Sequence, residues 1–393
     1  KYLDSLPTEE RYTAFEPLVR KHWKWLCRAA PYLKFPEPKP ILEGQRINIG
    51  IRIWRMTSGG IERVMQLLAN YFEEGPRYHV TIFVDAREME HIDFPLHENI
   101  TLVGVPRNIN WGKIIEEYPQ DIVICPEHCE RRNAQNILLL KFLGIRVLAQ
   151  EHNFVLFTRP FNNLTEKIEC LLGLYSCCDA MSCLSQVDLN VWRRGRLLNS
   201  LYLPNPPTFD PADVTPSAHE TKDILWIGQW WLPWKRPEMA VEAFAKVLEK
   251  VPDARLIMLG TWGKYRSCRR CTQRIRELGI GDSVIIAGFR KDMEQYYSHG
   301  ALLLSTSKFE GFPMVMSEAK TFGLPVVSTA MPYLETLKKG CIQTPPNDAD
   351  ALADAVVDLL QNPEKRRQLG AEGRQDMLEN FSNEAVLRNM RRS

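Results

Sequence analysis

Two carboxylates lie close together in the segment STSKFEGFPMVMSEAKTFGLPVVST, residues 305–329. Glu310 and Glu318 have seven residues between them, and a Gly-Phe-Pro turn separates a strand-like run from a helix that we expect to begin close to Ser317. Carboxylates accept strong hydrogen bonds from hydroxyl groups, whereas turn amides at a helix start bind anions. This arrangement predicts a site for sugar or ribose hydroxyls beside a diphosphate, and two solvated glutamates are the alternative.

The elements that must position these residues follow an alternating pattern of strands and helices. Strand-like runs occur at residues 46–54, 79–85, 100–105, 121–126 and 146–152, and again at 223–228, 254–260, 283–289, 301–307 and 325–330. Helical apolar spacing lies between them, which is typical of parallel sheets covered by helices. The sequence therefore predicts two Rossmann-like α/β domains that face each other across a cleft.

Proline marks the boundary between the two domains, because five prolines fall within residues 203–216, a density that neither a helix nor a central strand tolerates. We expect a helical extension at 1–42, an N-terminal acceptor-side domain at 43–205 and a C-terminal nucleotide-sugar-binding domain at 206–375. Residues 376–393 are predicted to form a C-terminal helix that crosses back to the N-terminal domain. The substrate names in this division depend on the family resemblance described below.

The composition excludes several classes of protein. The chain has 393 residues with 45% hydrophobic and 25% charged residues, which excludes a disordered chain. Its net charge of +2 gives no global field for nucleic acid. Apolar runs are too short to span a membrane, and ten cysteines are too few for a disulfide scaffold, which favours reduced thiols in a cytoplasm. For Cys268 and Cys271, ordinary helix positions are favoured over a metal site.

The first 40 residues differ from the rest of the chain. Residues 13–35 interleave the basic residues Arg20, Lys24 and Arg28 with Trp23 and other large apolar side chains. Such a helix suits peripheral contact with an anionic membrane surface, whereas the alternative is a helix packed on the N-terminal domain with a solvated basic edge.

Around Glu310 the sequence resembles the paired-glutamate motif of retaining nucleotide-sugar glycosyltransferases with the GT-B fold, of the kind grouped in glycosyltransferase family 4. The resemblance covers about residues 46–380 and is strongest in the second half. It implies that Glu310 contacts the transferred sugar and that Glu318 holds the ribose. The backbone from Gly311 through Phe312 and Pro313 to Met314 would then meet the diphosphate.

A second match to this family lies in residues 224–260. The family has a glycine, an arginine directly after it and a lysine six positions after the arginine, and both cations neutralise the diphosphate. Gly228 and Lys235 match, but Gln229 replaces the arginine and brings no charge. The resemblance therefore implies that another cation compensates, and neighbouring Arg236 is the candidate. A solvated surface lysine is the alternative for Lys235.

The N-terminal half matches the family more loosely. Gly59 and Gly60 in MTSGGIERV resemble a glycine-rich turn that lets donor phosphate or acceptor approach the backbone. His152 in QEHNF stands where the family often has a histidine that faces the sugar. An ordinary tight turn and a locally bonded loop histidine are the alternatives.

The resemblance implies a retaining glycosyltransferase in cell-surface glycan synthesis that uses a nucleotide-sugar, with UDP favoured, and a glycan, lipid-linked or protein-linked acceptor. It implies no metal and no other cofactor. We expect a cytoplasmic location, with peripheral contact at the inner membrane surface as one form of it. A catalytically silent scaffold, suggested by Gln229, and a nucleotide-sugar epimerase are the alternatives.

Overall fold

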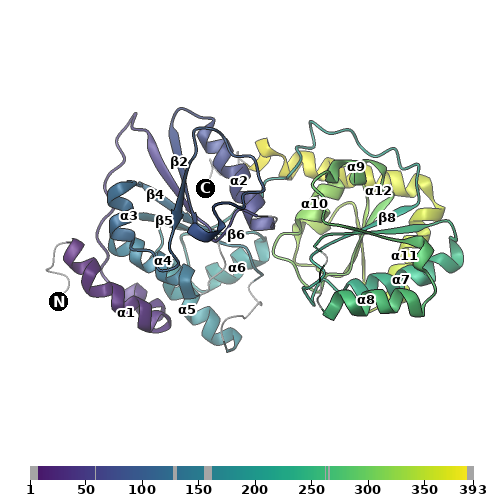
Figure 1. The fold of residues 1–393 in the computed structure, drawn as a ribbon, viewed down its shortest axis with the longest axis horizontal. Coiled ribbons are helices and arrows are strands. Elements are labelled where there is room, and N and C mark those ends of the chain that lie inside the picture. The colour runs from purple at the N-terminus through teal and green to yellow at the C-terminus, as the bar shows by residue number, and fades with distance from the viewer. Residues whose placement is uncertain are drawn as a thin grey trace. The chain divides into compact units, whose positions relative to one another are not determined.

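The computed structural model describes residues 8–57, 59–126, 131–154, 162–261, 263 and 266–386. The chain divides into two compact units, Lys1–Pro204 and Asn205–Ser393. Each unit has its own parallel sheet with helices packed on it (Figure 1).

The N-terminal unit contains a parallel 7-stranded sheet in the order β3-β2-β1-β4-β5-β6-β7. Its strands are β1 (Ile47–Arg52), β2 (Tyr78–Asp85), β3 (Thr101–Val105), β4 (Ile122–Cys125), β5 (Arg146–Glu151), β6 (Ala180–Cys183) and β7 (Ser200–Tyr202). Its helices are α1 (Thr8–Ala29), α2 (Gly60–Glu73), α3 (Trp111–Glu117), α4 (Arg131–Phe142), α5 (Leu164–Ser176) and α6 (Gln186–Arg194). Ile49 of β1 pairs with Val80 of β2 on one side and with Ile122 of β4 on the other. The strand order therefore reverses beside β1.

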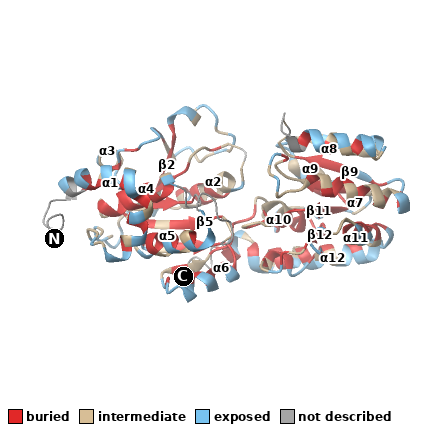
Figure 2. Ribbon diagram, turned by 90° about the horizontal axis from the view of Figure 1, so that it is seen from below, coloured by how far each residue is buried: buried red, intermediate tan, exposed pale blue. Residues whose placement is uncertain are grey.

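The central strands β1, β2 and β4 are mostly apolar and buried because helices cover them. In β2, every residue from Val80 to Asp85 is buried, and Figure 2 shows the buried residues concentrated on the strands and on the inward helix faces. Strands covered on both faces need such continuous apolar runs instead of an alternating pattern. The same property made these strands visible in the sequence.

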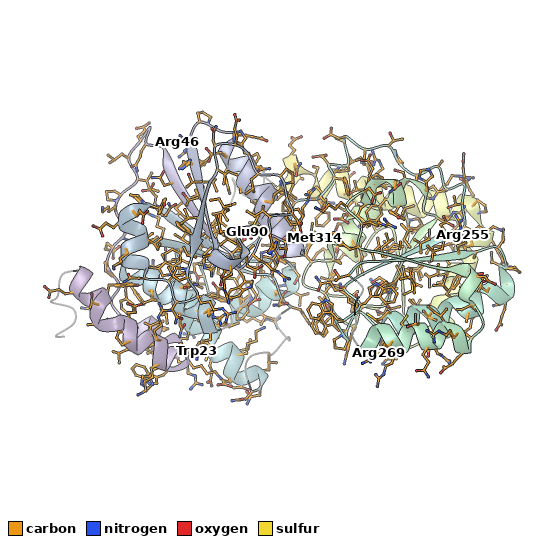
Figure 3. The ribbon with its side chains drawn as sticks, in the orientation of Figure 1. Trp23, Arg46, Glu90, Arg255, Arg269 and Met314 are labelled. Carbon is orange, nitrogen blue, oxygen red and sulfur yellow. The ribbon has the colours of Figure 1, made fainter. Side chains whose placement is uncertain are left out.

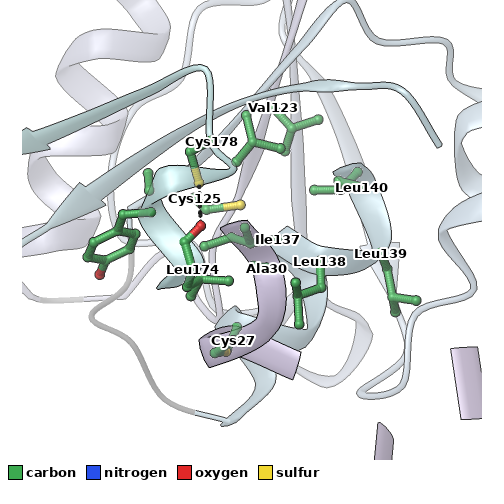
Figure 4. Packing of buried hydrophobic residues seen from close by; sticks show 14 of the residues in the cluster. Cys27, Ala30, Val123, Cys125, Ile137, Leu138, Leu139, Leu140, Leu174 and Cys178 are labelled. Atoms are coloured by element: carbon green, nitrogen blue, oxygen red, sulfur yellow. Dashed lines mark hydrogen bonds between the residues drawn. The ribbon is translucent and has the colours of Figure 1, made fainter. Parts of the chain in front are cut away.

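Helix α1 is part of the core of the N-terminal unit. Its apolar residues Val19, Trp23, Leu26 and Cys27 are buried against α4 and α5. Figure 4 shows Cys27 and Ala30 among leucines of α4 and α5. The helix is interrupted at His22, whose φ of −120° is not helical. Residues of the expected helical extension therefore pack as an integral layer of this unit.

Three basic side chains of α1 bind groups of the same unit. Lys24 Nζ donates to Glu166 of α5 at 2.7 Å, and Arg28 lies 3.8 Å from the same carboxylate. Arg20 donates to Glu16 at 2.9 Å and to the carbonyl of Ile109 at 2.7 Å. These contacts support the packed-helix alternative over the membrane-surface hypothesis. Among the described residues, no helix is both long enough and apolar enough to span a membrane.

The C-terminal unit contains a parallel 6-stranded sheet in the order β10-β9-β8-β11-β12-β13. Its strands are β8 (Asp223–Ile227), β9 (Arg255–Leu259), β10 (Val284–Gly288), β11 (Leu302–Ser305), β12 (Val326–Thr329) and β13 (Cys341–Thr344). Its helices are α7 (Pro237–Lys250), α8 (Arg266–Glu277), α9 (Met293–His299), α10 (Met314–Thr321), α11 (Ala349–Gln361) and α12 (Pro363–Asp376), followed by a π-helix at Met377–Phe381.

The cysteines of α8 lie on its inner side. Cys268 and Cys271 are buried in the apolar cluster under α7, and burial raises the pKa of Cys271 to about 12. Arg269, labelled in Figure 3, is on the exposed side. Both cysteines therefore act as apolar core residues, in line with the favoured interpretation of the sequence.

Some elements differ from the sequence analysis. β6, β7 and β13 are short strands of three or four residues whose sequences carry little pattern. α10 begins at Met314 and not close to Ser317, because Pro313 occupies the position before the helix and its fixed φ suits a helix start. Glu318 consequently lies in the second turn of α10 and not at its start.

Candidate functional site

The carboxyl ends of β8 and β11 hold the candidate residues of the C-terminal unit together. The two strands pair in parallel, so both end at the same edge of the sheet. Thr306, directly after β11, accepts a hydrogen bond from Trp226 Nε1 at 3.0 Å and donates to the carbonyl of Lys235 at 2.7 Å. Trp234 and Phe309 stack with ring centroids 5.4 Å apart. The loop after β8 is thereby fastened to the loop after β11.

This fastening brings Lys235 and Glu310 into contact although 75 positions separate them. Lys235 Nζ donates to Glu310 Oε1 at 2.5 Å, and the two side chains are only 17% and 12% exposed. A pair so shielded from water is stronger than a surface ion pair, since water screens it less. The sequence analysis placed these residues in one site, and the structure places them in direct contact.

The backbone of Glu310 is held by Tyr333, a residue that the sequence analysis missed. The Tyr333 hydroxyl accepts a hydrogen bond from Glu310 N at 3.0 Å and donates to Glu310 O at 3.2 Å. One hydroxyl thus satisfies both backbone groups of the same residue. Tyr333 fixes the position from which the Glu310 carboxylate extends.

Glu318 accepts hydrogen bonds from two hydroxyl groups. Thr208 Oγ1 donates to Oε1 at 2.5 Å, and the Tyr297 hydroxyl donates to Oε2 at 2.6 Å. Burial, followed by the Glu318 charge, raises the pKa of Tyr297 well above its usual value, so this phenol remains a donor. Each carboxylate oxygen has a second lone pair, so Glu318 can accept further hydroxyl hydrogen bonds.

The Arg236 side chain forms hydrogen bonds within the C-terminal unit. The residue precedes α7 with a left-handed φ of +50°, and its guanidinium donates to Thr306 O at 2.6 Å, Asn347 Oδ1 at 2.5 Å and Thr329 Oγ1 at 3.2 Å. Burial lowers the pKa of this arginine. These bonds tie the loop after β8 to the carboxyl ends of β11 and β12 and to the loop after β13, which argues against the expectation that Arg236 supplies the charge missing at Gln229.

Gly228 lies where two strand ends approach closely. Gly260, after β9, has φ +119°, and a methyl group on it would lie 1.9 Å from the carbonyl oxygen of Gly228. Gly260 therefore needs to be glycine, and Gly228 packs closely against the Trp226 ring, 3.1 Å from where a methyl group would lie. Gln229 follows directly and is half-buried, so its side chain lies within the loop that carries Lys235. The sequence analysis included Gly228 and missed Gly260, which ends the apolar run 254–260.

The turn before α10 uses its side chains for packing. Phe312 is 8% exposed and contacts Phe381, and Met314, labelled in Figure 3, accepts a hydrogen bond from Asn205 Nδ2 at 3.6 Å. Gly311 and Pro313 complete the turn. With the side chains packed, the backbone at the positive end of α10 is the part that can meet an anion.

The N-terminal unit holds the remaining candidates at the carboxyl edge of its sheet. His152 directly follows β5 and is 8% exposed. Gly59 precedes α2, and Gly60 is its first residue. The carboxylate of Glu62 bends back over Gly59 and accepts a hydrogen bond from Arg55 at 3.1 Å. A phosphate at this helix start would therefore have to displace an acidic side chain.

Three hydroxyl residues of the site were not predicted from the sequence: Tyr297, Thr208 and Tyr333. Thr208 lies among the prolines of the linker, Tyr297 is in α9, and Tyr333 follows β12. Each is a hydroxyl donor near a strand end or helix of the C-terminal unit. No spacing relates them to the glutamates, so only the tertiary structure identifies them.

Comparisons with known proteins agree with the architecture. Residues 213–376 match the family model described as glycosyl transferases group 1. N-acetyl-alpha-D-glucosaminyl L-malate synthase of Bacillus anthracis is 28% identical over 158 residues, which is 39% of this chain and 40% of that protein. An uncharacterized glycosyltransferase of Haemophilus influenzae is 25% identical over 258 residues, 64% of this chain and 70% of that protein. The alignment thus spans less than half of the first of these relatives.

Solved structures share the two-unit fold. Sucrose-phosphate synthase from Thermosynechococcus elongatus superposes with a TM-score of 0.75 at 18% identity, over 88% of this chain and 98% of that one. Anabaena HepE, in a complex with UDP and glucose, gives a TM-score of 0.71 at 17% identity over 88% and 98%. At such identities the likeness shows the fold and leaves the ligand of this chain to be argued from its residues.

Proposed function

We propose that this chain transfers a sugar from a nucleoside-diphosphate donor with retention of the anomeric configuration. Residues 213–376 match the group 1 glycosyltransferases, and the two units have the GT-B fold. One observation carries the proposal. Lys235 and Glu310 meet at the carboxyl edge of the C-terminal sheet, beside the turn that precedes α10. Ligands of open α/β sheets bind at this edge.

The chemistry required is stabilisation of the leaving group. As the bond between sugar and diphosphate breaks, negative charge grows on the diphosphate, and Lys235 together with the amides of residues 311–314 supplies the opposing charge. Glu310 would exchange its bond from Lys235 for hydroxyls of the transferred sugar. Glu318 would accept hydroxyls of the ribose, as it accepts those of Thr208 and Tyr297 in this structure.

Retention follows in this proposal from attack on the side of the leaving group, with a phosphate oxygen taking the proton of the acceptor. Glu310 needs no role as nucleophile, because its carboxylate is already assigned to binding. His152 would bond a sugar hydroxyl or position the acceptor. Comparison of the anomeric configuration of donor and product by NMR tests retention, and an inverted product would refute it.

UDP is the nucleotide that we propose for the donor. The support is the UDP complex of Anabaena HepE, whose fold this chain shares, and the form of the motifs around Glu310 and Gly59. We also propose that Lys235 and the turn amides neutralise the diphosphate without a divalent metal. Thermal unfolding with UDP, GDP, ADP and their sugars tests the nucleotide, since only a bound ligand raises the unfolding temperature. Transfer that stops on addition of EDTA would refute the metal-free part.

Cell-surface glycan synthesis and a cytoplasmic location also remain proposals. They depend on the resemblance of EGFPMVMSEA and GGIERV to enzymes of surface polysaccharide assembly. Incubation of the protein with UDP-sugars and lipid-linked or glycan acceptors, followed by mass spectrometry, tests the first of these. The location is tested by fractionation of cells that express the chain.

A catalytically silent scaffold is the second candidate, and one observation favours it. Gln229 stands where the resemblance expects a cation, and the structure commits Arg236 to three bonds within the fold. Lys235 would then face the diphosphate as its main side-chain cation. Slow hydrolysis of nucleotide-sugar without acceptor would identify a transferase, whereas a scaffold would show binding at most.

A further inference from the structure

Three arginines converge on one indole ring at the carboxyl edge of the N-terminal sheet. The guanidinium carbons of Arg87, Arg107 and Arg132 lie 5.5, 5.2 and 4.9 Å from the ring centroid of Trp54. Trp54 follows β1, Arg87 follows β2, Arg107 follows β3 and Arg132 is in the first turn of α4. Segments after three neighbouring strands and from the helix after β4 thus gather positive charge at one place.

Asp85 offsets only part of this charge. It is buried, and it accepts bonds from Arg87 Nε at 2.9 Å and Nη2 at 2.7 Å, while Arg107 is 4.0 Å away. The Arg87 hydrogen bonds lower the pKa of Asp85 to about 2, against the effect of burial. Asp85 is therefore ionised at neutral pH and, together with Glu88, which acts on Arg87, offsets part of the charge of the three arginines.

The geometry of the arginines leaves their donors accessible. A guanidinium that lies over an aromatic ring contacts the ring with its flat face, and its N–H groups remain in its own plane for an acceptor. Arg107 is 50% exposed and Arg132 is half-buried. Neither side chain is fully buried, so a ligand can reach both cations from solvent.

Two further features at this place favour an anion. The first turn of α4 contains no acidic residue, so Arg132 stands at the positive end of a helix of 12 residues, whereas Arg131 donates to the carbonyl of Arg20 in α1. An anion that binds between the arginines reduces the repulsion among these positive charges and the positive end of the helix. The strand order also reverses between β1 and β4, and ligands of parallel sheets bind at such a reversal.

We propose that Trp54, Arg107 and Arg132 form a binding site for an oxyanion, a phosphate or carboxylate group, carried by the acceptor substrate. The assignment to the acceptor rests on the proposed function, because that function places the donor diphosphate at Lys235 in the C-terminal unit. The binding of an oxyanion by these residues does not depend on it. Arg87 acts as a positioning residue that holds Asp85.

Calorimetric titration of the full chain with glycerol 3-phosphate and with succinate tests the site, with neutral glycerol as the ligand control. Each titration is done with and without saturating UDP, so that phosphate binding at the donor site is blocked in one arm. We expect an oxyanion to bind in both arms. Arg107→Gln and Arg132→Gln should each weaken this binding about tenfold or more, because each removes a charge-assisted bond.

Arg77→Gln is the matched control. Arg77 also lies over an aromatic ring, Tyr78 at 5.9 Å, but at the amino end of β2, away from the expected ligand edge. It should leave binding unchanged. The proposal would be overturned by equal weakening in Arg77→Gln, by unchanged binding in both test variants, or by the absence of oxyanion binding both in solution and on phosphatidylglycerol vesicles. Thermal unfolding of each variant verifies that the fold is intact.

A separate vesicle experiment distinguishes an oxyanion carried by a lipid from one carried by a soluble molecule. Vesicles of phosphatidylglycerol in phosphatidylcholine replace the soluble anions, and sedimentation is measured for the same variants. Binding of the soluble anions that depends on Arg107 and Arg132 identifies a small acceptor group, whereas dependence seen only with vesicles identifies a lipid-carried phosphate. All of these readouts are made without sugar transfer, so loss of transfer alone would refute the proposed function and leave the site standing.

Discussion

Glu310→Gln is expected to strengthen the binding of UDP while it reduces sugar transfer. In the structure the Glu310 carboxylate holds Lys235 at 2.5 Å, with both side chains less than a fifth exposed. In the proposed function, the donor diphosphate competes with this carboxylate for the ammonium group. Replacement by an uncharged amide of the same shape releases Lys235 for the phosphates, but it weakens the contacts that the carboxylate would make with sugar hydroxyls.

The magnitude follows from the bond that is lost. A hydrogen bond to a charged group contributes about 1.5 to 3 kcal/mol. Lys235 keeps two further donors, so the phosphates could bind it without complete separation from Glu310. We therefore expect only part of this free energy to appear, roughly 0.7 to 1.4 kcal/mol, which corresponds to a threefold to tenfold lower Kd for UDP.

Isothermal titration with UDP measures this effect, and transfer from the intact donor is measured in parallel. Glu318→Gln is the matched comparison, because the ribose contact exists in donor and product alike and its loss should weaken UDP binding about tenfold or more. In a Lys235→Gln background, Glu310→Gln should no longer change UDP affinity. Equal losses of UDP affinity in Glu310→Gln and Glu318→Gln would refute this division of roles.

Three other predictions concern Arg236, Asp85 and helix α1. Gln229→Arg should strengthen UDP binding severalfold, because Arg236 is already bonded within the C-terminal unit. For the same reason Arg236→Ala should lower the unfolding temperature, and a normal unfolding temperature in calorimetry would contradict this. Asp85 has its pKa lowered from 3.8 to about 2 in the folded state, so its stabilisation is complete above pH 4 and is lost as pH falls toward 2. Urea unfolding at several pH values should show this loss, and Asp85→Asn should remove it. Deletion of residues 1–33 should destabilise or unfold the N-terminal unit, because it exposes the core beneath α1. The truncated chain should sediment with anionic vesicles no less than the intact chain does.

The α/β architecture could be read from the sequence because its cause is local. A strand covered on both faces must be apolar throughout, and the helices between strands must carry one apolar face, so the chain shows its layers as alternating patterns. The strands β6 (AMSC), β7 (SLY) and β13 (CIQT) lacked such patterns because they contain no run of three large apolar residues, unlike β4 and β11 of similar length. Pro313 alone would have corrected the start of α10.

The types of residue at the candidate site were also evident from the sequence. Glu310 and Glu318 stand on either side of one turn, and Lys235 follows a strand that ends in glycine, so their chemistry could be inferred from neighbours along the chain. The helix α1 showed the limit of such inference. Its basic row suited a membrane, but the acids that bind Lys24 and Arg28 lie on α5, some 140 residues away.

Only the tertiary structure decided which partner each of these groups has. Parallel pairing of β8 with β11 places Lys235 against Glu310, brings Arg236 to the carboxyl ends of β11 and β12, and sets Tyr333 on the Glu310 backbone. The arginines around Trp54 likewise meet because the strands before them are neighbours in the sheet. Sequence patterns report whether a residue faces the core or water, whereas hydrogen bonds and ion pairs extend only a few ångströms and depend on which distant segments the fold brings together.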